Sequence, residues 1–552
     1  MRSKLTGIRL SRLRLIISLL PLAFALVGFL LYYNGDVPYA LFSSLRVYVA
    51  SFDASYAGMQ EWAVAHPQGL AVLMRVCLEL GRWLGIAVTA TFVTNLLKEA
   101  WRHETMRRNA LRRDAVALHG SQRYKRLLAG SIHERTLTDD LPEIFDARRH
   151  VLAFDSDAEL FQYLTAHFSQ LLPPAPPAAA PRSVYLCLTA PLQTHYDNRG
   201  FIINNMAEDC ARVYWHRLYV RRHSSAPDRR IVLIGFGRYG QALLKQALLI
   251  NLFVDQANME YHIFGDSEAY RRQHPGLNGF AAVNESQPGK DAIFFHAEPW
   301  QESLPLLLSA DRILLADDAE ENNLLALAHL RENNAAVHVH LRLSDLRLAE
   351  AFWPGRRVAE YDYNADICVF GTDQSLYTRR IVMDEALILA ARCINAKYMR
   401  RAAKGRCASC HYPDTLAECA QHCDALDADW QSLSHFLQEA NLLQADHIPV
   451  KLRQMLKQDC ELSPQTLADY ALHYEQVQRE GGMKPFFALE HERWMRHHYY
   501  YNWSYAPDRD DAHLRHPLMV PYDDLPEIQK PKDADPYAII PEVGAVVMQA
   551  FS

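Results

Sequence analysis

The chain has 552 residues, too many for one hydrophobic core, which predicts three or four domains. Its net charge of -6 is small and its charged share of 22% is ordinary, so nothing points to nucleic acid and we expect no nucleic-acid partner. Ten cysteines are too few for a disulfide-stapled secreted protein and suit a reducing compartment.

The N-terminal region, residues 1–113, is predicted to be a two-helix membrane anchor in contact with the lipid bilayer. Residues 15–33 (LIISLLPLAFALVGFLLYY) carry no charge and are long enough to span a bilayer, although Pro21 can kink the helix. A second span is predicted at residues 76–97. The alternative for the first run is a cleaved signal peptide, but the apolar run continues well past the small residues that would be cut.

The flanking charges predict the orientation of these spans. Basic residues precede the first span and follow the second, whereas the loop between them holds only Arg46 and Arg75. Positive residues stay on the cytoplasmic side, so we expect a multi-pass protein of the bacterial inner membrane with both termini in the cytoplasm. The loop segment 37–52 could form a re-entrant or interfacial helix. No TVGYG-like potassium filter follows it.

Residues 229–375 contain the strongest local motif, IVLIGFGRYGQALLKQALLI. An apolar strand runs into Gly-x-Gly-x-x-Gly, and a helical pattern follows, as in dinucleotide-binding folds. Further strands are predicted at residues 261–264, 292–295, 313–316 and 337–341, so strands and helices alternate and a doubly wound parallel sheet is expected. Asp266, at the end of the second strand, could hold ribose hydroxyls.

These residues predict an α/β fold whose glycine turn and second strand bind NAD(H) or an adenine nucleotide. The phosphates would lie on the helix N-terminus, where free N–H groups and the helix dipole favour negative charge. The alternative is that the glycines serve packing alone. The predicted cofactor-binding residues are Gly235, Phe236, Gly237, Arg238, Tyr239, Gly240 and Asp266.

Residues 114–228 resemble a degenerate first copy of the same fold. VALHGSQRYKRLL aligns without gaps onto VLIGFGRYGQALL when it is placed so that Gly120 matches Gly235. The strand at 151–154 ends in Asp155, which would mirror Asp266, and SVYLCLTA and VYWHRLYV echo two later strands. Gln122 and Lys125 replace the second and third glycines and would block a pyrophosphate. We therefore expect this copy to be structural or dimerising, with PPAPPAAAP at 173–181 as an exposed loop.

Two spans followed by the fold around GFGRYG resemble the potassium-transport regulator domains called RCK N-terminal, KTN or TrkA-N. The resemblance covers about residues 10–375. It implies a regulatory domain for NAD, NADH, ATP or ADP that assembles in pairs or rings and moves an attached membrane part. The missing filter and the lost glycines of the first copy are departures from that pattern.

A helical connector is predicted at residues 376–428, and it carries a cysteine cluster. Cys407, Cys410, Cys419 and Cys423 could hold a structural Zn²⁺ tetrahedrally, although the two pairs are closer than in common zinc ribbons. The alternative is a loop with ordinary reduced thiols. The CxxCH match to a haem attachment site does not suit a cytoplasmic segment.

The C-terminal region, residues 429–552, is rich in aromatic side chains and shows no Ser-His-Asp or metalloprotease spacing. It resembles the RyR domain, a mainly helical repeat found in ryanodine receptors and in bacterial proteins. The residues that carry this resemblance are Glu490, His491, Trp494, Trp503, Tyr505, Asp508, His516, Pro517, Leu518, Tyr522, Leu525 and Asp533. Asn502 stands where the family typically has glycine.

Five of these side chains are predicted to form a cage that stacks on a base or a cation and binds an anion. They are His491, Trp494, Trp503, Tyr505 and His516. The alternative is that the aromatic side chains are the core of a small helical domain.

Together these patterns predict a membrane-anchored, nucleotide-sensing regulator or ligand-gated effector, related to potassium ion transport and not an enzyme. A homo-oligomer is expected, because two spans per chain cannot enclose a pore alone. The alternatives are a membrane-tethered NAD(P)-dependent oxidoreductase and a scaffold that binds no ligand. Against the oxidoreductase, no Tyr-x-x-x-Lys or catalytic His–Asp pair follows the glycine motif.

Overall fold

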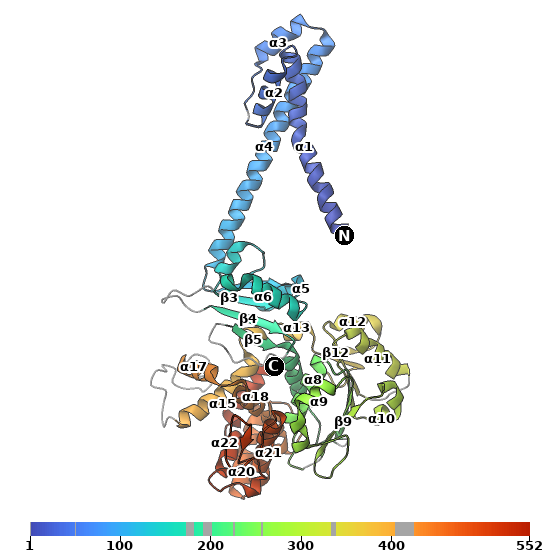
Figure 1. Cartoon of the computed structure of the whole chain (residues 1–552), viewed down its shortest axis with the longest axis vertical. Helices are drawn as coiled ribbons and strands as arrows, with labels where there is room; N and C mark the ends of the chain where they lie inside the picture. Colours follow the sequence, from blue (N-terminus) through green and yellow to red (C-terminus); the bar gives the residue numbers. More distant parts are fainter. Residues whose placement is uncertain are drawn as a thin grey trace. The chain divides into compact units, whose positions relative to one another are not determined.

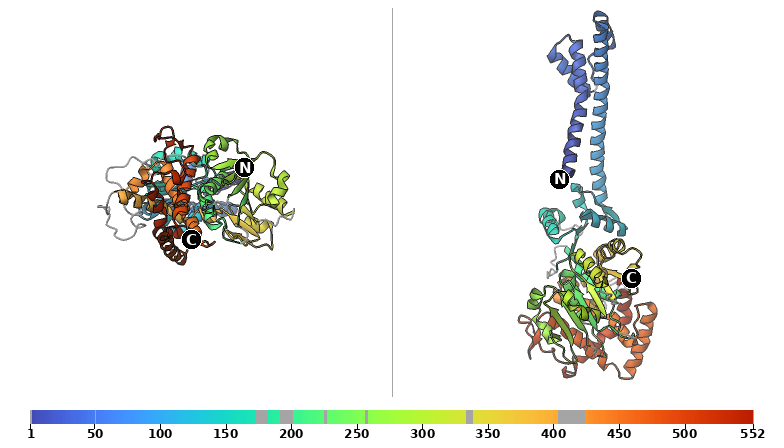
Figure 2. Two further views of the ribbon diagram at one scale, coloured as in Figure 1. Left: turned by 90° about the horizontal axis from the view of Figure 1, so that it is seen from below. Right: turned by 90° about the vertical axis from the view of Figure 1, so that its right-hand side faces the viewer.

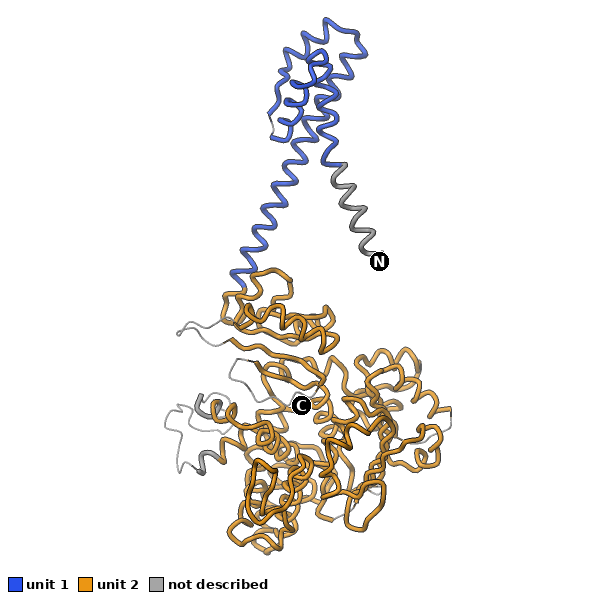
Figure 3. The backbone as a smooth tube through the Cα atoms, viewed as in Figure 1, with its two compact units in different colours: residues 1–109 blue, residues 110–552 orange. Residues whose placement is uncertain are grey.

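The computed structural model describes residues 2–49, 51–172, 182–190, 201–224, 227–255, 258–332, 338–402 and 424–551. These residues fall into two compact units, 1–109 and 110–552 (Figure 3). Each unit has its own hydrophobic core and is described by itself. The predicted loop 173–181 and the four connector cysteines lie outside the described residues.

Unit 1 is helical. It consists of α1 (Arg2–Tyr32), α2 (Val37–Arg46), the 3₁₀ turn η1 (Val47–Val49), α3 (Tyr56–Ala65) and α4 (Gln68–Ala110). Helices therefore occupy both predicted spans and the first part of the loop segment 37–52. Among the described residues one helix, α4, is long and apolar enough to cross a membrane, whereas the apolar stretch Ile17–Tyr32 of α1 is shorter.

Helices α1 and α4 approach each other at small residues. A Cβ atom added to Gly28 would lie 2.7 Å from the Leu78 side chain, and one added to Gly81 would lie 2.8 Å from Ala25. Gly81 and Gly85 have the GxxxG spacing that allows close helix packing in membranes. The outward faces expose large apolar side chains, among them Val27, Val76, Leu80, Phe92 and Leu97.

Unit 2 begins with a five-stranded parallel sheet in the order β2-β1-β3-β4-β5. Its strands are β1 (Ala115–Gly120), β2 (Arg135–Leu137), β3 (Arg149–Ala153), β4 (Ser183–Leu188) and β5 (Phe201–Asn205). The associated helices are α5 (Gln122–Ser131), η2 (Pro142–Asp146), α6 (Asp157–Leu171) and α7 (Met206–Arg217). This is the strand order of flavodoxin-like doubly wound sheets.

Two details of the predicted repeat are wrong. Strand β3 lies on the side of β1 opposite to β2, so it does not take the position of the second strand and Asp155 does not mirror Asp266. The sequence VYWHRLYV begins in helix α7 and forms no strand. The side-chain oxygen of Asn205 caps α7 by accepting two backbone N–H groups at 3.2 Å each. Eight of the twelve residues of α7 are buried, and its β-branched and aromatic run VYW resembles a buried strand.

The second sheet has eight parallel strands in the order β12-β13-β11-β10-β6-β7-β9-β8. Six neighbouring strands of this sheet, read in space as β9, β7, β6, β10, β11 and β13, have the order 3-2-1-4-5-6 of a Rossmann sheet. Strands β8 and β12 extend its two edges. The strands are β6 (Arg230–Ile234), β7 (Glu260–Phe264), β8 (Ala281–Val283), β9 (Asp291–His296), β10 (Arg312–Leu315), β11 (His338–Arg342), β12 (Val358–Glu360) and β13 (Ile367–Phe370). The helices are α8 (Arg238–Ile250), α9 (Glu268–Gln273), η3 (Pro275–Gly279), η4 (Trp300–Ser303), α10 (Leu304–Leu308), α11 (Glu320–Glu332) and α12 (Leu346–Phe352).

Helices cover both faces of this sheet (Figures 1 and 2). Ile231 and Leu233 of β6 belong to a core with α8, whereas Val232 and Ile234 belong to a second core with α10 and α11. The first core is continuous: it also contains residues of the first sheet, of α7 and of the C-terminal helices. The doubly wound α/β class is confirmed.

The remaining chain is mainly helical. Its elements are α13 (Asp373–Leu376), α14 (Arg379–Val382), α15 (Ala386–Ala402), α17 (Asp424–Ser432), α18 (His435–Asp446), α19 (Ile448–Leu456), α20 (Pro464–Arg479), α21 (Lys484–Tyr500), β14 (Ser504–Tyr505), β15 (Arg515–His516), η5 (Tyr522–Asp524), η6 (Lys530–Ala534), α22 (Asp535–Ala538) and α23 (Ile540–Phe551).

Candidate functional site

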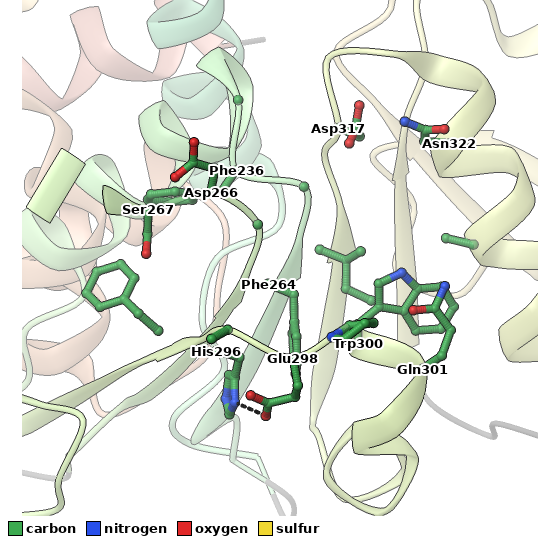
Figure 4. A pocket seen from close by; sticks show the side chains of 18 of the residues that line it. Phe236, Phe264, Asp266, Ser267, His296, Glu298, Trp300, Gln301, Asp317 and Asn322 are labelled. Atoms are coloured by element: carbon green, nitrogen blue, oxygen red, sulfur yellow. Dashed lines mark hydrogen bonds and ion pairs between the residues drawn. The ribbon is translucent and has the colours of Figure 1, made fainter. Parts of the chain in front are cut away.

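A cavity of about 1020 Å³ lies at the carboxyl ends of β6, β7, β9 and β10. In a doubly wound sheet this is the topological switch point, where ligands bind. Figure 4 shows Asp266 and Ser267 on one side of the cavity and Asp317 and Asn322 on the other, with Trp300 and Gln301 also facing it. Its volume suits a dinucleotide or a smaller nucleotide.

Gly235 and Gly240 of the motif occupy positions where backbone atoms exclude a side chain, whereas Gly237 faces only the end of the Asp318 side chain. Gly235 has a φ of +93°, and a Cβ atom there would lie 2.3 Å from the backbone nitrogen of Asp317. A Cβ atom on Gly240 would lie 2.2 Å from the carbonyl oxygen of Gly235, which allows close packing of helix and strand. A Cβ atom on Gly237 would lie 2.5 Å from the Asp318 carboxylate.

Asp318 occupies the N-terminus of α8, where the phosphates were predicted to bind. Its carboxylate accepts hydrogen bonds from the backbone N–H groups of Arg238, at 3.1 Å, and Tyr239, at 3.3 Å. These donors are among those left free in the first turn of a helix. A phosphate at this position must therefore displace the carboxylate or bind beside it.

The seven predicted cofactor-binding residues divide into two groups. Gly235, Phe236, Gly237 and Asp266 line the cavity, and the exposed Asp266 accepts only the N–H of Glu268 in its own turn, at 3.1 Å, among the described residues. The other three do not line it. The Arg238 guanidinium contacts Thr189 and Asp157. Tyr239 is buried beneath Arg342, whose guanidinium lies 4.0 Å from the ring centre, and Gly240 packs against β6.

Several residues that line the cavity were not predicted. His296 pairs with Glu298 at 2.9 Å, and Trp300 contacts His329 edge to face at 5.3 Å. Asp317, which lines the cavity, and the adjacent Asp318 lie just beyond the end of β10, so the rule that strand carboxyl ends face the ligand could have indicated them. With Asp266, Glu268, Glu298 and Asp317 against the single cation Arg271, the lining is acidic.

The first copy has the same turn but carries a buried lysine at the third glycine position. Gly120 has a φ of +121°, and a Cβ atom there would lie 1.7 Å from the Ala153 carbonyl oxygen. Lys125, at the third glycine position, is buried and donates to Asp140 at 2.6 Å and to the Thr138 carbonyl at 3.2 Å. This arrangement favours the structural role that was predicted for the first copy.

Four of the five predicted cage residues lie together near the end of α21. Trp494 stacks on His491 at a centroid distance of 5.5 Å and contacts His516 at 5.0 Å. Trp503 lies 6.2 Å from His516 and stacks on Phe436 at 5.4 Å. These rings fill the space between one another, and Tyr505 is exposed to solvent. The geometry is that of a packed aromatic cluster.

Residues 486–540 match the RyR domain family. Within this RyR domain Glu490 is a structural centre, because it pairs with Lys451 at 2.7 Å and Arg493 at 2.8 Å, all three being buried. Although burial opposes its ionisation, Arg493 and Lys451 lower the pKa of Glu490 to about 2. Asp533 lies 3.6 Å from His491, and burial raises the pKa of Asp533 to about 7.

The RyR domain is docked on the second sheet through Asn502. This residue takes the left-handed conformation, with a φ of +63°, which glycine would also adopt. Its side chain accepts from the N–H of Gly276 at 3.1 Å and donates to the Gln273 carbonyl at 2.8 Å. Arg496 adds a buried ion pair to Asp291 at 2.6 Å. The docked segment, α9 and η3, is continuous with the residues that line the cavity.

Among solved structures the chain is similar to the GsuK channel, to a point mutant of GsuK and to GsuK bound to ADP. The sequence identities are 11%, 11% and 12%, and the TM-scores are 0.30, 0.30 and 0.29. Each comparison covers 68% of this chain and 96–97% of the other. No curated protein matches the chain.

The predicted zinc ligands fall outside the described part of the chain. Within the described part, no group of three or more metal-ligating side chains gathers at one point.

Proposed function

We propose that the chain is a membrane-anchored regulator that senses a nucleotide at the carboxyl edge of its second sheet. The observation that carries this proposal is the cavity at the switch point, where the glycine turn forms part of the wall and the exposed Asp266 can accept ribose hydroxyls. NAD(H) and adenine nucleotides are the ligand classes that suit these features.

The acidic lining sets a condition on this ligand. A bare polyphosphate would be repelled by Asp266, Glu298, Asp317 and Asp318, so the phosphates would enter with a divalent cation or would point away from α8. The adenosine part would meet Phe236 and Trp300, which offer aromatic surfaces.

The membrane anchor is supported by the exposed apolar side chains of α1 and α4, which water would not favour. If unit 1 is embedded in a bilayer, the full-length protein will stay in the membrane fraction after washes with high salt and with alkaline carbonate. Release into the supernatant by either wash would contradict the anchor. We also propose a homo-oligomer, which cross-linking of the full-length protein in its native membrane tests.

Ligand binding is tested by titrating the full-length protein with ADP and with NAD⁺, each with and without Mg²⁺, in a calorimeter. We expect Asp266→Ala to weaken binding about tenfold or more, because the ribose loses a charged acceptor. Glu285→Ala is the matched control, since Glu285 is exposed in the same domain and does not line the cavity. Equal affinities in the wild type and Asp266→Ala would place the ligand elsewhere.

A further inference from the structure

A second cavity, of about 550 Å³, adjoins the cavity at the switch point and shares the lining residues Glu268, Arg271 and Phe295 with it. Its remaining lining comes from the end of α9, from η3 and from the end of β8. We call it the α9 cavity. Because the two cavities share part of their walls, a group attached to a ligand at the switch point can reach the α9 cavity.

The α9 cavity differs in charge from the acidic cavity at the switch point. It is lined by Arg271 and Arg272, and Glu268 is the one acidic residue in its lining. Glu268 lies 3.6 Å from Arg272 on the next turn of α9, whereas no carboxylate of a described residue pairs with Arg271. His274 donates its Nδ1–H to the Tyr500 carbonyl oxygen at 3.1 Å, and burial lowers its pKa, so it is uncharged at neutral pH. The α9 cavity thus has a net positive charge and one unpaired guanidinium.

Arg271 stands where the two cavities meet. Its guanidinium lies 5.5 Å from the centre of the Phe295 ring, a contact that orients the side chain and leaves the N–H groups at its edge available. Its backbone N–H donates to the Ser267 carbonyl oxygen at 2.9 Å, so one turn of helix separates Arg271 from Ser267. Side chains related in this way are about 5–6 Å apart at their Cβ atoms. Arg271 therefore lies beside Asp266, the proposed acceptor of ribose hydroxyls, which precedes Ser267 and lines the same cavity.

The position of Asp318 favours a ligand whose phosphates are separated from each other. In ADP both phosphates form one chain, and in the usual orientation that chain would lie at the start of α8, beside Asp317 and the Asp318 carboxylate. A phosphate on the ribose would instead lie near Asp266, within reach of Arg271. Arginine binds phosphate through paired, charge-assisted hydrogen bonds, which an unpaired guanidinium offers without first losing an ion pair.

We propose that the α9 cavity binds a phosphate carried on the ribose of an adenine nucleotide, with Arg271 as the principal residue that holds it. One ribose hydroxyl, 2′ or 3′, would donate to Asp266, and the other oxygen would carry the phosphate that Arg271 binds. This ligand occupies the nucleotide site of the proposed function, on which the assignment rests, and its class is a nucleoside bisphosphate in place of a diphosphate. Arg272 contributes a second positive charge at the same wall.

The test compares three isomers by calorimetric titration of the full-length wild-type protein in the presence of Mg²⁺: ADP, adenosine 2′,5′-bisphosphate and adenosine 3′,5′-bisphosphate. Each carries two phosphate groups, so a difference in affinity reports where the second phosphate lies. We expect one of the two bisphosphates to bind about tenfold or more tightly than ADP, and that isomer identifies the phosphorylated hydroxyl. If ADP binds as tightly as both bisphosphates, the assignment of the α9 cavity is overturned while the nucleotide site stands. If none of the three binds at millimolar concentration, the proposed function fails as well.

The variant Arg271→Gln tests the role of the guanidinium. Because Arg271 lines both cavities, the measured quantity is the ratio of the bisphosphate affinity to the ADP affinity within each protein. We expect Arg271→Gln to lower this ratio about tenfold. Arg356→Gln should leave the ratio unchanged, because Arg356 is exposed in the same domain and lines neither cavity. A ratio that survives in Arg271→Gln overturns the proposal, and the comparison of isomers in the wild type decides it if this variant fails to fold.

Discussion

At the scale of single residues, Asp318 places a negative charge where a dinucleotide-binding sheet receives phosphate. Its carboxylate satisfies two N–H groups at the start of α8 and interacts favourably with the helix dipole. The same contacts stabilise the turn after β6 and oppose an anionic ligand. Stability and ligand affinity are therefore in conflict at this position.

This conflict predicts the effect of Asp318→Asn on ADP binding. We expect the variant to bind ADP about tenfold more tightly, roughly 1.4 kcal/mol, because one negative charge is removed while the side chain stays the same size. Calorimetry on the full-length protein measures the change. Glu268→Gln is the control: it removes the same charge from the cavity lining without touching α8, and its smaller effect would isolate the contribution of the helix N-terminus.

The lowered pKa of Glu490 predicts how the stability of the RyR domain changes as the pH falls. Its pKa of about 2 lies below the ordinary value of 4.5, so its contribution to stability is present above pH 4.5 and is lost as the pH falls toward 2. Glu490→Gln leaves Lys451 and Arg493 without their anion, which should cost about 3–5 kcal/mol at neutral pH.

Urea unfolding of the wild type and of Glu490→Gln, from pH 3 to pH 7, checks this prediction. The difference between the two proteins should shrink as the pH is lowered. Glu480→Gln, at the exposed end of α20, should change little at any pH. A difference that stays constant with pH would show that Glu490 is not the titrating group.

At the scale of elements, alternating strands and helices predicted five of the eight strands of the second sheet, whereas β8, β12 and β13 were not predicted. The motif strand and the four that follow it are confirmed, because buried parallel strands appear as short apolar runs between turn residues. The first sheet was predicted less well. Its second strand, β2, has three residues and a weak apolar pattern, so the repeat was aligned to β3 instead.

The site was predictable to a similar degree. The glycines of the motif indicate the tight turn directly, and Asp266 stands at the end of a predicted strand. These residues could therefore be predicted from the sequence. The role of Asp318 depends on β10 lying beside β6, a contact between residues 80 positions apart that no local pattern encodes. The packing of Trp494 and Trp503 against Phe436 and His516 is likewise a tertiary property.

The close contact of α1 and α4 predicts opposite effects for two glycines on one helix. Gly81→Ala should destabilise unit 1, because the added methyl would lie 2.8 Å from Ala25. Gly69→Ala, on the same helix, meets no atom within 4 Å and should stabilise it by up to about 1 kcal/mol through helix propensity. Thermal unfolding in detergent, followed by far-ultraviolet circular dichroism, measures both. Equal shifts would mean that the helices do not pack at Gly81.

At the scale of the whole second unit, one continuous core joins the two sheets to the C-terminal helices. The sheets and the RyR domain are therefore expected to unfold together. Asn502 contributes to this union through its two hydrogen bonds to η3 and α9. A substitution of Asn502 should therefore alter the position of residues that line the switch-point cavity, because α9 lines that cavity as well.

Two substitutions of Asn502 distinguish the contribution of its left-handed backbone to stability from that of its side-chain hydrogen bonds. Asn502→Gly keeps the left-handed backbone and removes both hydrogen bonds, for which we expect a loss of about 1–3 kcal/mol. Asn502→Ala also strains the backbone and should lose about 1 kcal/mol more. Urea unfolding measures both losses. If the Asn502→Gly variant were as stable as the wild type, the two hydrogen bonds would contribute nothing to the docking of the RyR domain.

In the proposed sensor, the Asp318 carboxylate would also determine the ligand concentration at which the protein responds. Since the α8 N-terminus carries its own anion in the resting state, a phosphate ligand gains only the difference between its contacts and those of Asp318. Such internal competition raises the response threshold without altering the shape of the cavity. Substitution at position 318 would thus change the ligand concentration at which the proposed sensor responds, without changing the residues that select the ligand.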